Sequence, residues 1–382
     1  MYNRNLGSQI LSNKKSALIL GPRQVGKSTL ISGLKPHLTI NLAEEQEYFT
    51  FQTELSELER RIAATNAKTI FIDEIQRIPR LTNSIQALID NNPKLRFFLT
   101  GSSARKLRKG KANLLPGRLI SYQLMPMCLD ELMSDWNESA ALSYGSLPGI
   151  ITTKSITEKK LILRSYASTY LKEEIMAEAL VRQIDGFVRF INAAAIDSGL
   201  YLDYSKLSKK AKVPRQSVSR HFEILEDTLI AKRVGNDPDI DLDKADLIKH
   251  PRFFFFDLGV VNAIRGSFDV SQERIGFLFE HLVFNQIVNS CTGNNLDYEL
   301  YNFKTRGGFE VDFIAKIEGT KFAIECKSSM TISTSEVNTI NRIDDYYSKI
   351  KKIIIYRGTK ELKDSGVWIL PLKKALEVLT KG

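Results

Sequence analysis

The sequence contains only three cysteines in 382 residues, and they lie far apart. Cys128, Cys291 and Cys326 are odd in number and include no pair at metal-ligand spacing, which argues against a disulfide framework and against a zinc site. The sequence also lacks a run of 18 apolar residues, an N-terminal stretch of signal-peptide form, internal repeats and low-complexity linkers. The expected location is therefore the reducing cytoplasm, without a segment that spans a membrane.

The composition is that of a folded, basic protein. The chain is 43% hydrophobic and 26% charged, which is ordinary for globular proteins with sizeable cores, and its length predicts two to three domains. A formal net charge of +10 and a pI near 9.3 favour a polyanionic partner, either nucleic acid or an acidic membrane surface. The alternative is a basic protein without such a partner, and a local basic cluster would be needed to distinguish the two.

The segment SALILGPRQVGKSTLISGL has the pattern of a phosphate-binding loop between a strand and a helix. Residues 17–20 are an apolar run that predicts a buried strand. Gly21 and Gly26 allow the backbone to turn and approach phosphate oxygens, so that loop amides and the helix N-terminus can surround them. Lys27 supplies a positive charge for the β and γ phosphates, and Ser28 offers a hydroxyl to Mg²⁺. The predicted nucleotide-binding residues are Gly21, Pro22, Arg23, Gln24, Val25, Gly26, Lys27, Ser28 and Thr29.

Two further apolar runs end in polar side chains. The sequence KTIFIDEIQRIP predicts a strand over residues 69–72, followed by Asp73 and Glu74. We predict that Asp73 holds the Mg²⁺ shell and that Glu74 is the general base that polarises the attacking water. The run LRFFLTGSS ends at Thr100, which could sense the γ-phosphate or only cap the strand. With the helix NSIQALIDNN between them, this order predicts a parallel sheet with crossover helices.

Four motifs resemble those of a known family. GPRQVGKSTL, FIDEIQRIP, FFLTGSSARKLRKGKANLLPGR and YGSLPG are similar to the predicted AAA+-type ATPases of bacteria and archaea that carry a C-terminal restriction-endonuclease-like domain. The similarity extends over nearly the whole chain. It implies that the protein binds and hydrolyses ATP.

Residues 102–118 form a basic segment without an acid, directly after the third predicted strand. Such a segment could give an arginine finger to a neighbouring subunit, contact the DNA backbone, or be a solvated loop. Arg118 in LPGR is the preferred finger candidate and Arg105 is the second. A finger used in trans predicts a homo-oligomer, with a hexameric ring among its candidate forms.

The middle of the chain is predicted to be helical. Residues 156–196 read as two amphipathic helices that form a lid or connector without chemistry of its own. Residues 202–234 predict a helix, a turn, a second helix and an apolar strand, which is the pattern of a winged helix-turn-helix. The second helix could contact phosphates and base edges, and packing or protein contact is the alternative. The candidate DNA-binding residues are Arg215, Gln216, Ser217, Ser219 and Arg220.

The C-terminal part resembles the core of the PD-(D/E)XK nuclease superfamily. A helix with Glu280 precedes strands that carry Asp312 and, thirteen residues later, Glu325 followed by Lys327. In a possible nuclease site, Asp312 and Glu325 would hold Mg²⁺ and Glu280 would complete its shell. Lys327 would position the water or stabilise developing charge. The alternative is a DNA-binding platform that does not cut.

These patterns together predict an α/β protein with a P-loop NTPase parallel sheet, a helical connector, a winged helix and a C-terminal α/β PD-(D/E)XK nuclease-like fold. The expected domains are an AAA+-like ATPase domain at 1–135, a helical lid or connector at 136–196, a winged helix-turn-helix at 197–250 and a nuclease-like domain at 251–382. The expected function is ATP hydrolysis, with ATP and Mg²⁺ as ligands, by an oligomeric motor that remodels or translocates DNA, branched DNA included among the candidates. An ATP-regulated endonuclease and a non-cutting nucleotide switch that recruits protein or regulates transcription are the alternatives.

Overall fold

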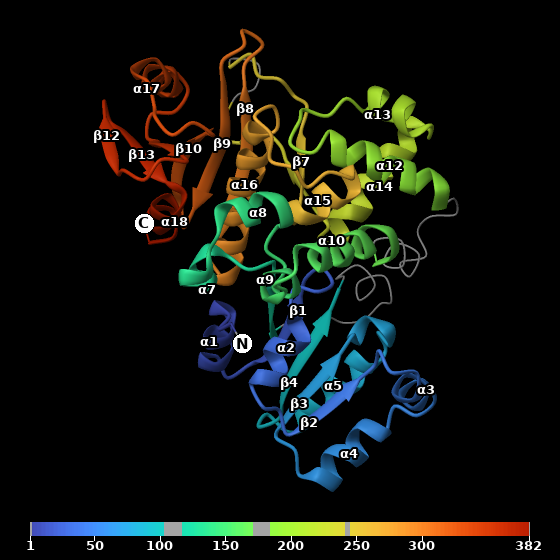
Figure 1. Ribbon diagram of the computed structural model, residues 1–382. Coiled ribbons are helices and arrows are strands. Elements are labelled where there is room, and N and C mark those ends of the chain that lie inside the picture. The colour runs from blue at the N-terminus through green and yellow to red at the C-terminus, as the bar shows by residue number, and fades with distance from the viewer. Residues whose placement is uncertain (1, 103–116, 171–183, 241–244, 382) are drawn as a thin grey trace. The chain divides into compact units, whose positions relative to one another are not determined.

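The structure is a computed structural model that describes residues 2–102, 117–170, 184–240 and 245–381 (Figure 1). The chain divides into two compact units. One consists of residues 1–125, 227–230 and 292–295, and the other of residues 126–226, 231–291 and 296–382. Arg105 and most of the basic segment lie outside the described residues. Within the part of the chain that is described, no helix has the length and apolar character needed to cross a membrane.

A five-stranded sheet lies at the centre of the first unit (Figure 1). Its strand order is β2-β3-β4-β1-β5, and every neighbouring pair is parallel. The strands are β1 (Ser16–Leu20), β2 (Leu38–Asn41), β3 (Thr69–Asp73), β4 (Arg96–Gly101) and β5 (Leu119–Gln123). The helices are α1 (Asn5–Ser12), α2 (Lys27–Gly33), α3 (Glu45–Thr53), α4 (Glu57–Thr65) and α5 (Leu81–Asn91), with a short 3-10 turn η1 (Ile75–Arg77).

The predicted parallel sheet is confirmed. Strands β1, β3 and β4 are the three apolar runs, and almost all of their residues are buried, as expected where both faces of a parallel sheet are covered. Strands β2 and β5 were not predicted. Both mix apolar and polar residues and are only partly buried, so neither shows the continuous apolar run that marks a central strand.

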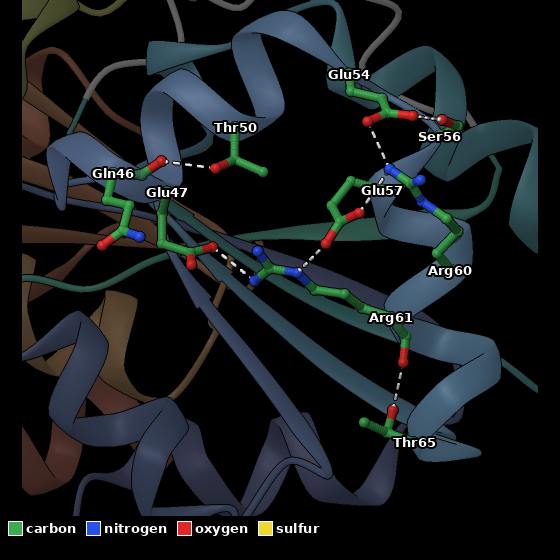
Figure 2. A network of polar contacts seen from close by, with 9 residues as sticks. All are labelled: Gln46, Glu47, Thr50, Glu54, Ser56, Glu57, Arg60, Arg61 and Thr65. Carbon is green, nitrogen blue, oxygen red and sulfur yellow. Dashed lines mark hydrogen bonds and ion pairs between the residues drawn. The ribbon is translucent and has the colours of Figure 1, made fainter.

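Arg61 on α4 joins this helix to α3 (Figure 2). Its guanidinium donates to Glu47 of α3 at 2.7 Å and to Glu57, one turn earlier on α4, at 2.8 Å. The same group lies 5.0 Å from the centre of the Phe51 ring. Because ion pairs near the surface contribute little stability, the buried side chains of Phe51 and Ile62 hold these helices on the core.

A six-stranded mixed sheet lies in the second unit, with the order β12-β13-β11-β10-β9-β8. Strands β8, β9 and β10 are antiparallel, whereas β10, β11 and β13 are parallel. The strands are β8 (Tyr298–Lys304), β9 (Glu310–Ile317), β10 (Thr320–Lys327), β11 (Lys351–Tyr356), β12 (Leu362–Asp364) and β13 (Val367–Pro371). The helices of this part are α15 (Leu258–Arg265), α16 (Ile275–Gly293), α17 (Thr334–Asn341) and α18 (Leu372–Lys381), with a 3-10 turn η4 (Arg342–Asp345). The predicted helix and strands form, while the nuclease-like assignment of the fold stays a prediction.

The remaining elements of the second unit are mostly helical. They are α7 (Leu129–Leu132), η2 (Met133–Asp135), α8 (Glu138–Tyr144), α9 (Pro148–Thr152), α10 (Ile156–Ser165), the π-helical turn η3 (Tyr166–Tyr170), α12 (Ile184–Ile196), α13 (Tyr204–Ala211), α14 (Arg215–Asp227), β6 (Ala231–Val234) and β7 (Arg252–Phe255). The predicted helix, turn, helix and strand over residues 202–234 form as α13, α14 and β6. Strand β6 pairs with β7 in an antiparallel ribbon. The winged-helix assignment and the domain boundaries stay predictions.

Candidate functional site

The strand order brings the predicted nucleotide-site residues to one edge of the first sheet. Strand β4 lies between β1 and β3, and all three run parallel, so that their carboxyl ends meet. The phosphate loop follows β1, Asp73 is the last residue of β3, and Thr100 is the next-to-last residue of β4. Ligands of open parallel sheets bind at this edge.

The phosphate loop needs its two glycines for different reasons. Gly26 has a φ of 92°, in the left-handed region that favours glycine. Gly21 is packed against the chain after β5, where a Cβ atom would lie 2.1 Å from the carbonyl oxygen of Leu124. Gln24 also has a positive φ, of 63°. Alternating backbone conformations of this kind turn successive amide groups toward one side, which suits an anion.

Arg4 supports the loop and was missed by the sequence analysis. Its guanidinium donates to the carbonyl oxygens of Val25 and Met125, both at 2.7 Å, and the residue is buried. These bonds join the phosphate loop to the chain after β5. No motif marks Arg4, because it lies well upstream of the loop in sequence.

Lys27 is bonded to its own loop. Its ammonium group donates to the carbonyl oxygens of Gly21 at 2.7 Å and Pro22 at 2.9 Å, and the side chain is buried. Phosphate oxygens would be stronger acceptors than these neutral carbonyls, because their negative charge attracts the ammonium group. The amine is therefore held where an anion in the loop could recruit it.

Asp73 is the centre of a hydrogen-bond cluster that joins three elements. The hydroxyl of Ser28 donates to Asp73 Oδ2 at 2.6 Å, and the hydroxyl of Thr100 donates to Asp73 Oδ1. The amide of Glu74 also donates to Asp73 Oδ1, at 3.1 Å. A hydroxyl and a carboxylate in contact are the hard oxygen donors that Mg²⁺ takes from proteins, so these residues fit the metal. Thr100 is fully buried against Asp73, and its role as sensor or cap stays a prediction.

Glu74 is held by Gln76, a second residue that the sequence analysis missed. Glu74 has a φ of 57° and directly precedes the η1 turn. The Gln76 side-chain amide donates to a carboxylate oxygen of Glu74 and, at 3.2 Å, to the hydroxyl of Ser102. Gln76 is buried, and among the described residues its Oε1 has no hydrogen-bond partner. The spacing of two residues from Glu74 is the only sequence signal that could have indicated this contact.

Arg118 lies near the amino-terminal ends of the parallel strands, whereas the phosphate loop of its own chain lies at their carboxyl ends. It precedes β5, whose first residue Leu119 pairs with Ser16 at the start of β1. Five residues of strand span about 17 Å at about 3.3 Å per residue. The Arg118 guanidinium forms two bonds with the carboxylate of Asp90, at 2.6 and 2.9 Å. Arg118 cannot therefore act on the nucleotide of its own subunit from this position.

The candidate DNA-binding residues lie in the first half of α14. Arg215, Gln216 and Arg220 are exposed, while Ser217 and Ser219 are half-buried. The opposite face of α14 packs inward through Val218, Phe222 and Leu225, which are buried. The exposed face is thus available for a ligand, and DNA contact stays a prediction.

The acidic residues of the possible nuclease site are partly paired. Lys327 donates to Glu325 at 2.8 Å, and the Cys326 amide donates to Asp312 Oδ2 at 2.7 Å. Burial and the neighbouring Asp312 raise the pKa of Glu325 to about 8 and that of Glu280 to about 7. Burial likewise raises the pKa of Asp312. Sequence reasoning correctly placed these acids on neighbouring elements, and their predicted role in cleavage stays a prediction.

Arg252 on β7 was missed by the sequence analysis and lies among these acids. Its guanidinium donates to the carboxylate of Glu280, to the carbonyl oxygen of Asp312 at 3.0 Å and to the carbonyl oxygen of Gly199. Across the described ranges, no three His, Cys, Asp or Glu side chains are grouped so that they could hold a metal ion. The cluster in this arrangement does not fit Mg²⁺.

Comparisons with known proteins agree with the first sheet and its loop. Residues 13–133 match the family described as an AAA domain. Residues 137–271 and 275–375 match two domains of unknown function, DUF8612 and DUF4143. Over 92% of its length the chain is 23% identical to the uncharacterized protein MJ1544 of Methanocaldococcus jannaschii, of which it covers 82%. The N-terminal part of the chain is therefore an AAA-type domain.

Two solved structures show a more distant likeness. A replication initiator DnaA bound to AMPPCP and single-stranded DNA is 10% identical, with a TM-score of 0.31 over 58% of this chain and 86% of that one. A STAND protein with a tetratricopeptide repeat sensor, PH0952 from Pyrococcus horikoshii, is 12% identical, with a TM-score of 0.26 over 77% of this chain and 47% of that one. Likenesses at these TM-scores carry no statement about activity.

Proposed function

We propose that the AAA-type domain binds ATP with Mg²⁺ and hydrolyses it, and that the protein acts on DNA as a homo-oligomer. The observation that carries the proposal is the contact between the phosphate loop and the acidic strand end, where Ser28 donates to Asp73 at 2.6 Å beside Lys27 and Glu74. The proposal is supported because the phosphate loop, Ser28, Asp73 and Glu74 all lie at the carboxyl ends of neighbouring parallel strands.

The proposed roles follow from these contacts. The loop amides and Lys27 bind the β and γ phosphates, and Lys27 exchanges its bonds to the Gly21 and Pro22 carbonyls for bonds to phosphate. Ser28 and Asp73 would hold Mg²⁺, which when bound supplies positive charge against the phosphates. Glu74 orients the attacking water and accepts its proton, because it directly follows Asp73 in the chain and its carboxylate is bonded to Gln76 rather than to the Asp73 carboxylate cluster.

Action on DNA is supported by charge. The formal net charge of +10 and the exposed Arg215, Gln216 and Arg220 at the start of α14 suit a phosphate backbone. Assembly is supported by Arg118, which lies at the sheet edge away from its own phosphate loop and could reach a nucleotide only in another subunit.

The test compares two substitutions in the same site. Lys27→Ala is expected to abolish tight ATP binding, because it removes a charge that contacts phosphate. Glu74→Gln is expected to leave ATP binding intact and to reduce turnover by about a hundredfold or more, because it removes only the base. Binding would be measured by calorimetry and turnover by phosphate release, each with and without single-stranded, duplex and branched DNA.

The matched controls are Lys94→Ala and Glu59→Gln, the same changes at exposed positions of the AAA-type domain. Both should bind and hydrolyse ATP at the wild-type level. Normal turnover by Glu74→Gln would show that the base is assigned wrongly. Turnover that no form of DNA alters would favour a nucleotide switch over a DNA-dependent motor.

A further inference from the structure

The guanidinium of Arg252 is surrounded on all sides by groups from the second unit. Its side chain is only 4% exposed. Its three kinds of nitrogen donate to different segments: Nε to the carbonyl oxygen of Gly199, Nη1 to that of Asp312 on β9, and Nη2 to the carboxylate of Glu280 on α16. One side chain thus joins β7, α16, β9 and the turn after α12.

Aromatic rings cover the remaining surface of this guanidinium. Its central carbon lies 4.8 Å from the ring centre of Phe254, 5.5 Å from that of Phe313 and 5.6 Å from that of Tyr201. A cation among aromatic faces is stabilised by their negative electrostatic potential. With the side chain only 4% exposed, the guanidinium itself has little contact with water.

The acids of the cluster already have positive or N–H partners. Glu280 accepts from Arg252, Glu325 accepts from Lys327, and Asp312 Oδ2 accepts from the Cys326 amide. Arginine does not lose its proton in proteins, so its charge persists at every accessible pH. A divalent ion bound to these carboxylates would face that fixed charge at short range, where repulsion between like charges is strong.

We infer that Arg252 is the permanent cation of this carboxylate cluster, and that it takes the place of a divalent ion there. The cluster consequently joins β7 and α16 to the mixed sheet, binds neither Mg²⁺ nor Mn²⁺, and does not cleave DNA. This inference does not depend on ATP hydrolysis by the AAA-type domain. It argues against the sequence-based hypothesis of a magnesium site at Asp312 and Glu325.

The first experiment is a calorimetric titration of the full-length, nucleotide-free protein with Mg²⁺. All proteins carry Asp73→Asn, so that the other candidate metal site is removed. The titration is done at neutral pH and again about one unit above the pKa of about 8 of Glu325, where that carboxylate is charged. The expected result is no binding at millimolar Mg²⁺ at either pH. Binding that is lost in Asp312→Asn would overturn the inference.

The second experiment removes the cation. Arg252→Met keeps an apolar chain among the rings and leaves Glu280 without its partner, and it is expected to gain Mg²⁺ affinity by about tenfold or more, since one fixed positive charge is lost. The added change Asp312→Asn should abolish the gain. Arg252→Lys, which retains the charge, should gain nothing. A folded Arg252→Met protein that binds no more Mg²⁺ than its parent would show that Arg252 is not what excludes the ion.

The third measurement covers the case in which Arg252→Met does not fold. Here the wild-type protein, in which Asp73 is intact, is the parent. It is incubated with Mg²⁺ or Mn²⁺ and linear, supercoiled or branched DNA, and Asp312→Asn in the wild-type background is the control. No cleavage by the parent supports the inference. Cleavage that disappears in Asp312→Asn overturns it, whatever the result of the binding assays.

Discussion

Gln76 connects the proposed base to the end of β4. Its side-chain amide donates to Glu74 and to Ser102, and its Oε1 lies close to Gly101, where an added Cβ atom would come within 2.7 Å. The Glu74 carboxylate therefore has one oxygen held by Gln76, which leaves the other to accept from water. A base that is fixed in this way loses less orientational freedom on reaching the transition state.

The prediction at this scale is that Gln76→Ala lowers the turnover number for ATP by about tenfold and leaves ATP affinity unchanged, because Gln76 positions Glu74 and does not touch the nucleotide. Steady-state turnover and calorimetry measure the two quantities separately. Gln46→Ala, the same change on an exposed turn of α3, should have no effect. Equal loss of affinity and turnover would instead indicate that Gln76 only stabilises the fold around the loop.

Among the elements, helix α14 has one face that packs on the core and an opposite face that carries the candidate DNA-binding residues. Val218, Phe222 and Leu225 recur at helical spacing and are buried, and Phe222 stacks on Phe253 of β7 with ring centres 4.1 Å apart. The face that carries Arg215 and Arg220 is left exposed. Substitutions on this face should therefore affect binding without affecting stability.

The prediction for α14 concerns salt. Each phosphate that a protein neutralises contributes about 0.9 to the slope of log affinity against log salt. Replacing Arg215 and Arg220 together by Ala should accordingly lower the slope by about two and weaken DNA binding at low salt. Fluorescence anisotropy over a series of salt concentrations measures this. Lys349→Ala with Lys351→Ala removes the same charge from exposed positions near β11, and an equal effect there would mean that net charge alone is responsible.

At the scale of the whole molecule, the two units differ in what they contain. The first has the nucleotide-site residues at one sheet edge and Arg118 at the other. Its proposed finger is paired with Asp90 of its own chain and would have to leave that carboxylate to reach a neighbouring subunit. The second has its own core around the mixed sheet, with α17 packed against β11.

The prediction for assembly is a complementation experiment. Arg118→Ala should cut ATP turnover by roughly a thousandfold, the lower end of what a finger in trans contributes, with little change in ATP affinity. Mixing Arg118→Ala with Glu74→Gln should restore part of the activity, because some sites then combine an intact base with an intact finger. Asp90→Asn, which releases Arg118, should not lower turnover. No recovery in proven mixed oligomers would exclude the trans role.

Local sequence alone was enough to predict the phosphate loop, the strands β1, β3 and β4, and the strands that carry Asp312 and Glu325. These features depend on residues that are neighbours in the chain: glycines at a turn, a run of apolar side chains, or alternation along a strand. Their hydrogen bonds and burial patterns are set within a short window, so the pattern is visible without any tertiary contact.

The partners of these residues were decided only by the tertiary structure. Strand β4 lies between β1 and β3, which brings Thr100 to Asp73, and parallel pairing puts Arg118 at the edge opposite the loop. Arg252 meets Glu280 and Asp312 across long stretches of sequence, although nothing in its own neighbourhood marks it as special. Strand order and packing depend on the summed burial of many distant side chains, and for that reason no local pattern could predict which charge would lie beside which acid.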